Sequence, residues 1–407
     1  MRVIVPVVYM MLLFLPGSVL SSPQIEYLLL AAIEDVDRIM PMPDVAKSDL
    51  SVSWINKAEV RYKHNNENEQ AYALRVQPKP GELYTAERTL YELYNEQNTV
   101  EYRSLLNDTL KEKYLVFIDV LQQQYDANYA VEYLALTKNK LALIQQLVQT
   151  SEFNPAELLQ TKLDVNHQDA QITIYVNQFK AMVSQHRWGD SSDTQFSLSS
   201  DIEWLLPIEE IKNSLNEYED RLHLLNNNLQ VKRRLLDLSI AKQDLLHDRA
   251  KNKSGISFVE LEYLDKNNNG GSITVGYSLP FGGDSVSKQR REKDVLYRQT
   301  VLHNSERKAM QIRATVVITL TSLFDQYSIV QLNLGDIEKQ TFSLSESTTP
   351  KMLLDLKQAQ LKQQKKLQDI YILVMRHYIE YLYTAGQLIA QPFRNVLHRN
   401  LPSLIGE

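Results

Sequence analysis

The feature that most constrains the fold is a stretch of 73 residues, 82–154, that contains neither glycine nor proline. Four further windows, 156–188, 208–254, 284–334 and 351–385, also lack both residues. Helices in compact domains average about 11–12 residues, so windows of this length indicate much longer helices. In the first window, apolar residues return at helical spacing between polar residues that tolerate water. A helix of this length would extend roughly 110 Å, and its apolar stripe needs a partner throughout, so the sequence predicts long antiparallel coiled-coil helices.

The N-terminus has the layout of a secretory signal. Arg2 precedes an apolar run over 3–15, which is followed by Pro16-Gly17 and small residues up to Ser22. We expect a signal peptide over 1–21. The alternative is an anchor that is never removed, but the apolar run is shorter than the roughly 20 residues that span a membrane. No later segment has 18 consecutive apolar residues, so any membrane crossing by the mature protein requires strands.

Two segments alternate between apolar and polar residues instead of following the helical period. They predict two hairpins, with strands at 57–63 and 71–77 and at 257–264 and 272–280. Each strand has about 8–10 residues with one apolar and one strongly polar face, as transmembrane barrel strands do. The aromatic residues expected at the membrane interfaces are Tyr62, Tyr72, Tyr263, Tyr277 and Phe281.

The order of elements recurs in the two halves of the chain. Pro78 and Pro280 end the hairpins 202 residues apart, and Gly189 and Gly386 close similar helices 197 residues apart. The predicted division is a signal peptide over 1–21, a first repeat over 22–190, an equatorial linker over 191–206, a second repeat over 207–390 and a C-terminal tail over 391–407. Besides a short helix near 24–40, helices are expected at 82–150, 155–187, 208–250, 285–340 and 350–386.

Patterns that carry enzymatic or metal chemistry are missing from the sequence. There is no cysteine, no pair of histidines at helical i, i+4 spacing and no GxSxG motif. Asp265–Gly270 begins like a calcium loop, but the twelfth position, which must supply a carboxylate, is Gly276. We therefore expect no enzyme, no cofactor and no metal site.

Charge gives no indication of a nucleic-acid partner. The net charge is −6, and the basic cluster Lys288, Arg290, Arg291 and Lys293 is mixed with acidic residues. The cluster is better explained as long side chains at a membrane interface below the second hairpin.

Several motifs resemble those of the outer-membrane efflux protein family typified by TolC. The stretch Gly271–Gly283, GSITVGYSLPFGG, is similar to the last strand of that family and its exit. Leu353–Leu361, LLDLKQAQL, continuing to Gly386, is similar to the final helix, and Glu157–Thr161 is a weaker first copy. The chain departs from the family where Ser151 and Glu346 replace a glycine before these helices, and where Met352 stands in place of an acidic residue.

The resemblance implies a homotrimer in the outer membrane of a Gram-negative cell, with a coiled-coil tunnel in the periplasm. Four strands from each of three copies would give a barrel of about 12 strands, and four strands alone cannot close in lipid. The implied function is a passive exit duct of a tripartite efflux pump or a type I secretion system, with an inner-membrane transporter and a periplasmic adaptor as partners. The alternative is a periplasmic structural or adaptor-like coiled-coil protein whose hairpins pack on protein.

The resemblance also suggests an entrance gate where the paired helices turn. Asp355 matches an acidic gate position of the family, and three copies would form a ring of like charge. Glu346, Glu152 and Glu157 are further candidates near the same rim. The alternative is that Asp355 is a solvated coiled-coil residue.

Overall fold

The computed structural model divides the chain into two compact units, each assembled from separated parts of the sequence. The helical unit comprises Met1–Ile39, Leu105–Leu224 and Gln311–Glu407, and the strand unit comprises Met40–Ser104 and Leu225–Met310. The structure describes residues 22–41, 53–64, 70–149, 153–185, 204–219, 227–251, 253, 255–265, 270–279, 285–344, 349–400 and 404.

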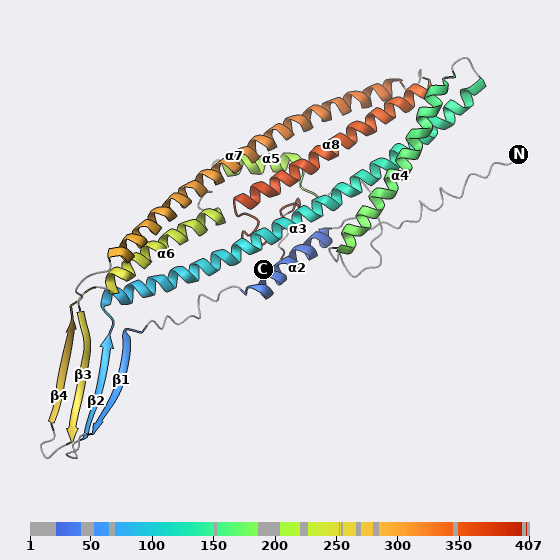
Figure 1. Cartoon of the computed structure of the whole chain (residues 1–407). Coiled ribbons are helices and arrows are strands. Elements are labelled where there is room, and N and C mark those ends of the chain that lie inside the picture. The colour runs from blue at the N-terminus through green and yellow to red at the C-terminus, as the bar shows by residue number, and fades with distance from the viewer. Residues whose placement is uncertain are drawn as a thin grey trace. The chain divides into compact units, whose positions relative to one another are not determined.

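The strand unit contains one antiparallel sheet in which the two predicted hairpins are joined. Its strands lie side by side in the order β1–β2–β3–β4 (Figure 1). Their bounds are β1 Ile55–His64, β2 Gln70–Pro78, β3 Gly255–Asp265 and β4 Gly270–Ser278. The strand β2 pairs with β3, so Leu74 of the first hairpin lies opposite Leu261 of the second. Among the described residues, β1 and β4 are the edges of the sheet.

Three helices belong wholly or partly to the strand unit: α3 (Gly81–Gln146), α6 (Leu229–Lys251) and α7 (Ser285–Leu344). The prediction of one helix over 208–250 is wrong. Two helices are present, α5 (Ile208–Glu219) and α6, and residue 228 between them is not helical. The Asn228 side chain accepts a hydrogen bond from the Val231 N–H (3.0 Å) and so caps α6. Three consecutive asparagines, 226–228, carry this signal, because asparagine favours caps over helix interiors.

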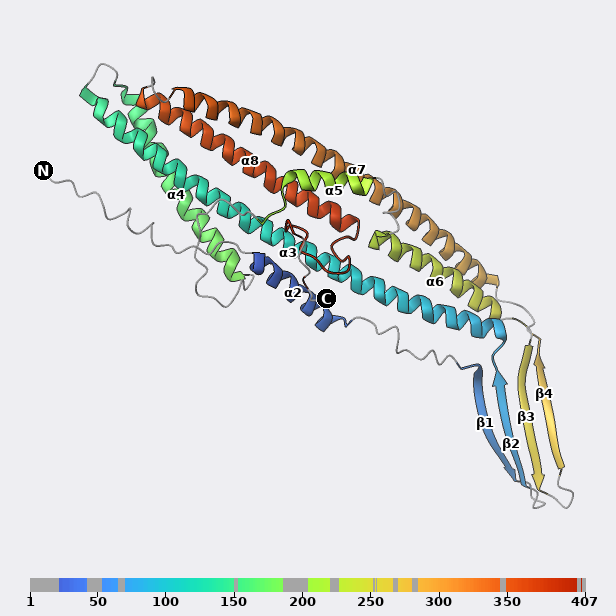
Figure 2. The same ribbon diagram turned by 180° about the vertical axis from the view of Figure 1, so that it is seen from behind.

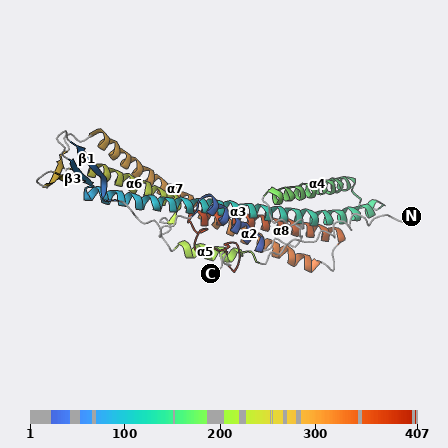
Figure 3. The same cartoon turned by 90° about the horizontal axis from the view of Figure 1, so that it is seen from below.

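The helical unit contains α2 (Ser22–Ile39), α4 (Pro155–Gln185), α5, α8 (Pro350–Thr384) and parts of α3 and α7. Within this unit α8 runs alongside α3 (Figure 2), and α4 runs alongside α3 after a short 3₁₀ segment, Leu147–Gln149 (Figure 3). The core is mainly apolar, with a few buried polar side chains such as Asn107, Gln124 and Asn395. Fully buried members of the core include Ile25, Leu29, Phe117, Ile118, Leu121, Ile211, Leu320, Ile372 and Ile379.

Local signals explain where the helices begin and end. Pro155 and Pro350 occupy the first turn of α4 and α8, where the missing N–H costs nothing. The Asn154 side chain caps α4 by accepting a hydrogen bond from the Ala156 N–H (3.0 Å). Gly386 ends α8 with φ 65°, and hydrogen bonds from Gly386 and Gln387 to the carbonyls of the last turn complete the motif.

Ion pairs between α3 and α8 fix the register of the two helices. Four contacts follow one another along the pair: Lys111 with Glu380 (2.5 Å), Asp119 with Arg376 (2.6 Å), Asp126 with Lys365 (2.6 Å) and Lys140 with Asp355 (2.7 Å). The sign changes along α3 from positive to negative and back to positive. Sliding one helix along the other would bring like charges together, so the pattern favours a single alignment.

The described part of the C-terminal tail is folded onto the helical unit. The Tyr114 hydroxyl donates to the Arg394 carbonyl (3.3 Å) and accepts from the Val396 N–H (3.1 Å). Leu206, at the end of the predicted linker, donates its N–H to the Leu397 carbonyl (2.9 Å). The tail therefore covers part of the core.

The predicted fold class, mainly helical with a small β part, is confirmed, because long helices accompany one four-stranded sheet. The observed strands lie within two residues of the predicted bounds. The predicted signal peptide and most of the linker lie outside the described residues. None of the helices in the described part of the chain combines the length and apolarity that crossing a membrane requires.

Candidate functional site

The sheet exposes its apolar face. Val60, Leu74, Leu261 and Ile273 form one row across the four strands, and the Val60 side chain is 82% exposed. Other large, exposed apolar or aromatic side chains on this face are Tyr62, Tyr72, Tyr263, Val275 and Tyr277. Burial of one such side chain is worth about 1.5–3 kcal/mol, so a face of this size left in water would be costly.

The opposite face is charged, and its side chains cover one another. The Glu260 carboxylate contacts Arg75 (3.8 Å) on β2 and Arg61 (3.6 Å) on β1. Glu59 contacts Lys57 and receives a 2.6 Å hydrogen bond from Arg61. The Glu260 side chain is only 12% exposed, far less than Val60 on the apolar face. The sheet thus inverts the arrangement of a sheet in water, where the apolar face is covered and the polar face is wet.

The predicted interface tyrosines gather at the two ends of the apolar face. Tyr62, Tyr72 and Tyr263 are register neighbours near the hairpin tips, and the Tyr62 and Tyr72 rings lie 5.2 Å apart. Tyr277 pairs with Ile256 near the other end of the sheet. Tyr263 lies seven residues after Ile256, so the two positions are about 23 Å apart at 3.3 Å per residue, comparable with the roughly 25 Å apolar band of outer-membrane barrels. Phe281 lies outside the described residues.

One aromatic residue, Phe258, lies on the charged face. It pairs with Gly276, and a Cβ atom at position 276 would lie 2.2 Å from the ring. The ring therefore lies over the bare glycine backbone. The Arg75 guanidinium stacks on the ring at 3.5 Å from its centroid. This stack could not be predicted from the sequence, because its members come from three strands.

The helices of the strand unit are joined by polar contacts near the sheet and beyond it. Lys253 contacts Glu82 (2.6 Å), and Arg291 contacts Asp248 (2.9 Å) and Asp244 (3.5 Å). Arg291 belongs to the predicted basic cluster, and its carboxylate neighbours, Asp248 first, raise its pKa above the usual arginine value. Arg291, one of the four residues of this cluster, therefore pairs with carboxylates of the protein and needs no lipid headgroup as a partner.

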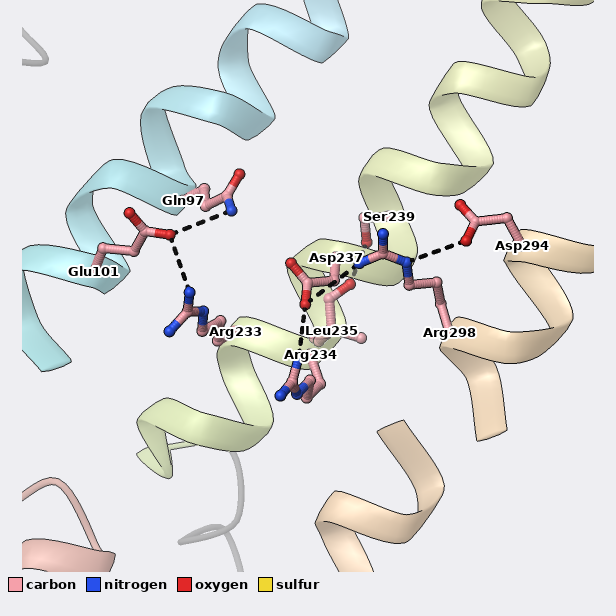
Figure 4. Close-up of polar contacts among 9 residues, drawn as sticks. All are labelled: Gln97, Glu101, Arg233, Arg234, Leu235, Asp237, Ser239, Asp294 and Arg298. Atoms are coloured by element: carbon pink, nitrogen blue, oxygen red, sulfur yellow. Dashed lines mark hydrogen bonds and ion pairs between the residues drawn. The ribbon is translucent and has the colours of Figure 1, made fainter. Parts of the chain in front are cut away.

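Figure 4 shows how the same three helices are connected farther along. Arg233 of α6 contacts Glu101 of α3 (3.5 Å), and Arg298 of α7 contacts both Asp294 (3.4 Å) and Asp237 of α6 (3.7 Å). Asp237 also accepts a hydrogen bond from Arg234 (3.2 Å). The network therefore holds α3, α6 and α7 in one arrangement beside the sheet.

The predicted gate residues Asp355 and Glu157 come together around a lysine. Lys140 of α3 lies 2.7 Å from Asp355 of α8 and 3.7 Å from Glu157 of α4, and Lys351 lies 2.6 Å from Glu157. Burial lowers the pKa of the Lys140 ammonium, but its hydrogen bond to Asp355 and the charges of Asp355 and Glu157 outweigh burial, so the pKa is raised. The cluster holds two charges of each sign. Glu152 and Glu346 lie outside the described residues.

Two residues of the strand unit went unnoticed in the sequence. Trp54 lies directly before β1, is exposed, and its carbonyl accepts a hydrogen bond from the Lys79 N–H (2.8 Å). An aromatic residue at the start of an alternating segment could have indicated an interface position. Arg75 alternates with apolar residues in β2, but its aromatic contact depends on pairing across strands.

No group of three or more histidine and carboxylate residues lies close enough to hold a metal ion in the described part of the chain.

The solved structures that share this fold over most of the chain include three described as outer-membrane proteins or channels. One is the outer-membrane channel OprN, with a TM-score of 0.60 and 11% identity over 90% of this chain and 90% of that one. Another is the CmeC outer-membrane channel of Campylobacter jejuni, with a TM-score of 0.59 and 9% identity over 89% of this chain and 86% of that one. A third is the outer-membrane protein VceC of Vibrio cholerae, with a TM-score of 0.57 and 11% identity over 90% of this chain and 93% of that one.

No protein-family model matches the chain, and no curated protein sequence matches it. At these identities the likeness establishes a common fold. The TolC-type fold that the resemblance implied, with long helices and a four-stranded sheet, is therefore confirmed as architecture.

Proposed function

We propose that this protein is an outer-membrane channel, the exit duct through which a tripartite efflux pump or a type I secretion system moves its cargo. The observation that carries the proposal is the inverted sheet, with an exposed apolar face and a charged, mutually covered face. One face of a barrel strand contacts lipid and the other contacts water. The exposed apolar face of this sheet suits lipid, and its charged face suits water. The fold shared with CmeC and OprN, both described as outer-membrane channels, supports the proposal.

The channel is proposed to assemble as a homotrimer. The edge strands β1 and β4 would leave unpaired N–H and C=O groups in lipid, where each costs several kcal/mol, so the edges need strands from other copies. Three copies would close a barrel of about 12 strands. A stripe of exposed apolar residues on α7, formed by Ile318, Ile329 and Leu332 at helical spacing, gives neighbouring copies a further surface to cover.

The proposed location is the outer membrane of a Gram-negative cell, with the helices in the periplasm. The partners would be a periplasmic adaptor protein and an inner-membrane transporter that supplies the energy. The channel itself would need no catalytic residue, because a water-filled path transports passively. Within it, the cluster of Asp355, Lys140, Glu157 and Lys351 is the proposed entrance gate.

The competing function is a periplasmic structural or adaptor-like protein. In that case protein would have to cover the apolar face of the sheet. The tyrosines at the two ends of that face, about 23 Å apart, favour lipid, because tyrosines collect at both edges of an apolar band.

Membrane fractionation tests the proposal. The mature protein is expected in the outer membrane, resistant to carbonate extraction, and trimeric by native mass spectrometry in mild detergent. Recovery from the soluble periplasm, or a stable monomer in detergent, would refute the channel and favour the structural alternative.

A further inference from the structure

The ion pairs on the charged face of the sheet share one orientation relative to water. In each pair the carboxylate lies deeper and the cation lies farther out. The exposed fractions of the side chains are 60% for Lys57 against 22% for Glu59, and 59% for Lys63 against 23% for Glu262. Arg61 is 39% exposed above Glu260 at 12%. The surface that this face presents to water is therefore positive, although carboxylates lie beneath it.

The Phe258 stack holds a fourth cation, Arg75, on this face. The ring lies over Gly276 and separates the Arg75 guanidinium from the backbone of β3 and β4. The distance of 3.5 Å between the guanidinium carbon and the ring centroid is that of a close cation–π contact. The stack thus holds Arg75 on the charged face, where its side chain is 21% exposed, less than those of Lys57, Arg61 and Lys63.

The described side chains of this face include four cations, Lys57, Arg61, Lys63 and Arg75, and three carboxylates, Glu59, Glu260 and Glu262. Both the excess of positive charge and the outward position of Lys57, Arg61 and Lys63 attract anions. A charged lining between low-dielectric walls raises the local concentration of ions of opposite sign.

We propose that the charged face of the sheet forms an anion-attracting section of the pore, suited to small anions and to cargo that carries carboxylate, sulfonate or phosphate groups. The inference rests on the proposed channel function. Three copies would place three sets of these cations around one lumen. This section is separate from the gate proposed at Asp355, which belongs to the helical unit.

Single-channel recordings in planar bilayers test the proposal. The double variant Lys57→Gln/Lys63→Gln removes two outward cations and leaves Glu59 its contact with Arg61 and the Phe258 stack untouched. The chloride-to-potassium permeability ratio, obtained from the reversal potential in a KCl gradient, should fall at least about twofold at 0.1 M salt. At 1 M salt the difference should shrink, because the Debye length falls from about 10 Å to about 3 Å.

The matched control is Arg38→Gln, which removes an exposed cation from α2 and should leave the permeability ratio unchanged. A second probe is block by naphthalene-2-sulfonate, which should weaken in the double variant, whereas block by a quaternary ammonium ion of similar size should not weaken. Channels with the same permeability ratio in the double variant and the unmodified protein would overturn this inference alone. Failure of the unmodified protein to form channels would overturn the proposed function and the inference with it.

Discussion

The helical unit and the sheet use the same kinds of residue in opposite ways. In the helical unit, Ile118 and Leu121 of α3 are fully covered, and ion pairs such as Arg376 with Asp119 lie at the partly exposed rim. In the sheet, Val60 is exposed while Glu260 is largely covered. The core of the helical unit therefore has the exposure pattern of a protein in water, whereas the sheet has the pattern expected of strands with lipid on one face.

The largest expected effect comes from a charge placed on the apolar face. Ile273→Arg replaces a side chain that is already exposed, so a protein in water would tolerate it. In lipid, an arginine near the membrane centre costs about 2–4 kcal/mol per copy, three times in a trimer. We expect loss of the trimer and of outer-membrane recovery, measured by fractionation and native gels.

The neighbouring residue supplies the control for this substitution. Thr274 lies on the charged face, opposite Glu260, so Thr274→Arg should be accepted with the trimer intact. Equal tolerance of both substitutions would contradict the assignment of lipid to the apolar face.

The second effect concerns the ion pairs between α3 and α8. Lys365 lies against Asp126 and Asp369, and burial lowers its pKa, but hydrogen bonds to both carboxylates outweigh burial and raise the pKa. Lys365→Ala leaves Asp126 without this partner in a partly buried position, at a cost of about 1–3 kcal/mol. The melting temperature in detergent, followed by circular dichroism, should fall, whereas the exposed neighbour Lys366→Ala should change it little. A similar loss for both variants would show that the ion pair does not stabilise the alignment.

The third effect is a loss of stability of the helical unit at alkaline pH. Burial raises the pKa of the Tyr371 phenol, whose hydroxyl donates to the Leu206 carbonyl (2.9 Å), and burial raises the pKa of Tyr114 as well. A raised pKa in the folded state means that this stability is fully present below the unfolded value near pH 10. It is lost as the pH rises above that value, by up to about 1.4 kcal/mol per pH unit for each tyrosine. The Tyr371→Phe variant should therefore melt with a shallower pH dependence above pH 10, whereas Tyr27→Phe, at an exposed position, should follow the unmodified protein.

The sequence predicted those features that depend on local periodicity. Windows without glycine and proline located α3, α4, α7 and α8, because a helix needs only continuity of suitable residues. The alternation of apolar and polar residues located all four strands, because it too is a local pattern along the chain. The break between α5 and α6 was not predicted, because the window 208–254 lacks glycine and proline and the three asparagines at 226–228 were not interpreted as a helix cap.

Features that depend on contacts between distant segments could not be predicted from the sequence. The stack of Arg75, Phe258 and Gly276 requires the register of three strands. The partner of Asp355 could not be predicted either, because Lys140 lies 215 residues away. Motif resemblance identified the acidic position, but the neighbouring charge depends on how α3 and α8 align.

The smallest expected effect is at Asp355, the acidic residue of the helical unit that pairs with Lys140. A carboxylate of the helical unit with a lysine at 2.7 Å contributes less charge to a pore than an unpaired one. Asp355 is also about half exposed, so the pair itself is worth less than about 1 kcal/mol. Asp355→Asn should lower the melting temperature by no more than a few degrees and should reduce the preference for cations in single-channel recordings.

The complementary variant Lys140→Met should increase the preference for cations, because Asp355 and Glu157 lose their shared cation. The double variant, which removes one charge of each sign, should return the preference close to that of the unmodified protein. If Asp355→Asn left both selectivity and conductance unchanged while Lys57→Gln/Lys63→Gln altered them, ion selection would reside in the sheet, and Asp355 would be a coiled-coil residue that aligns α3 with α8.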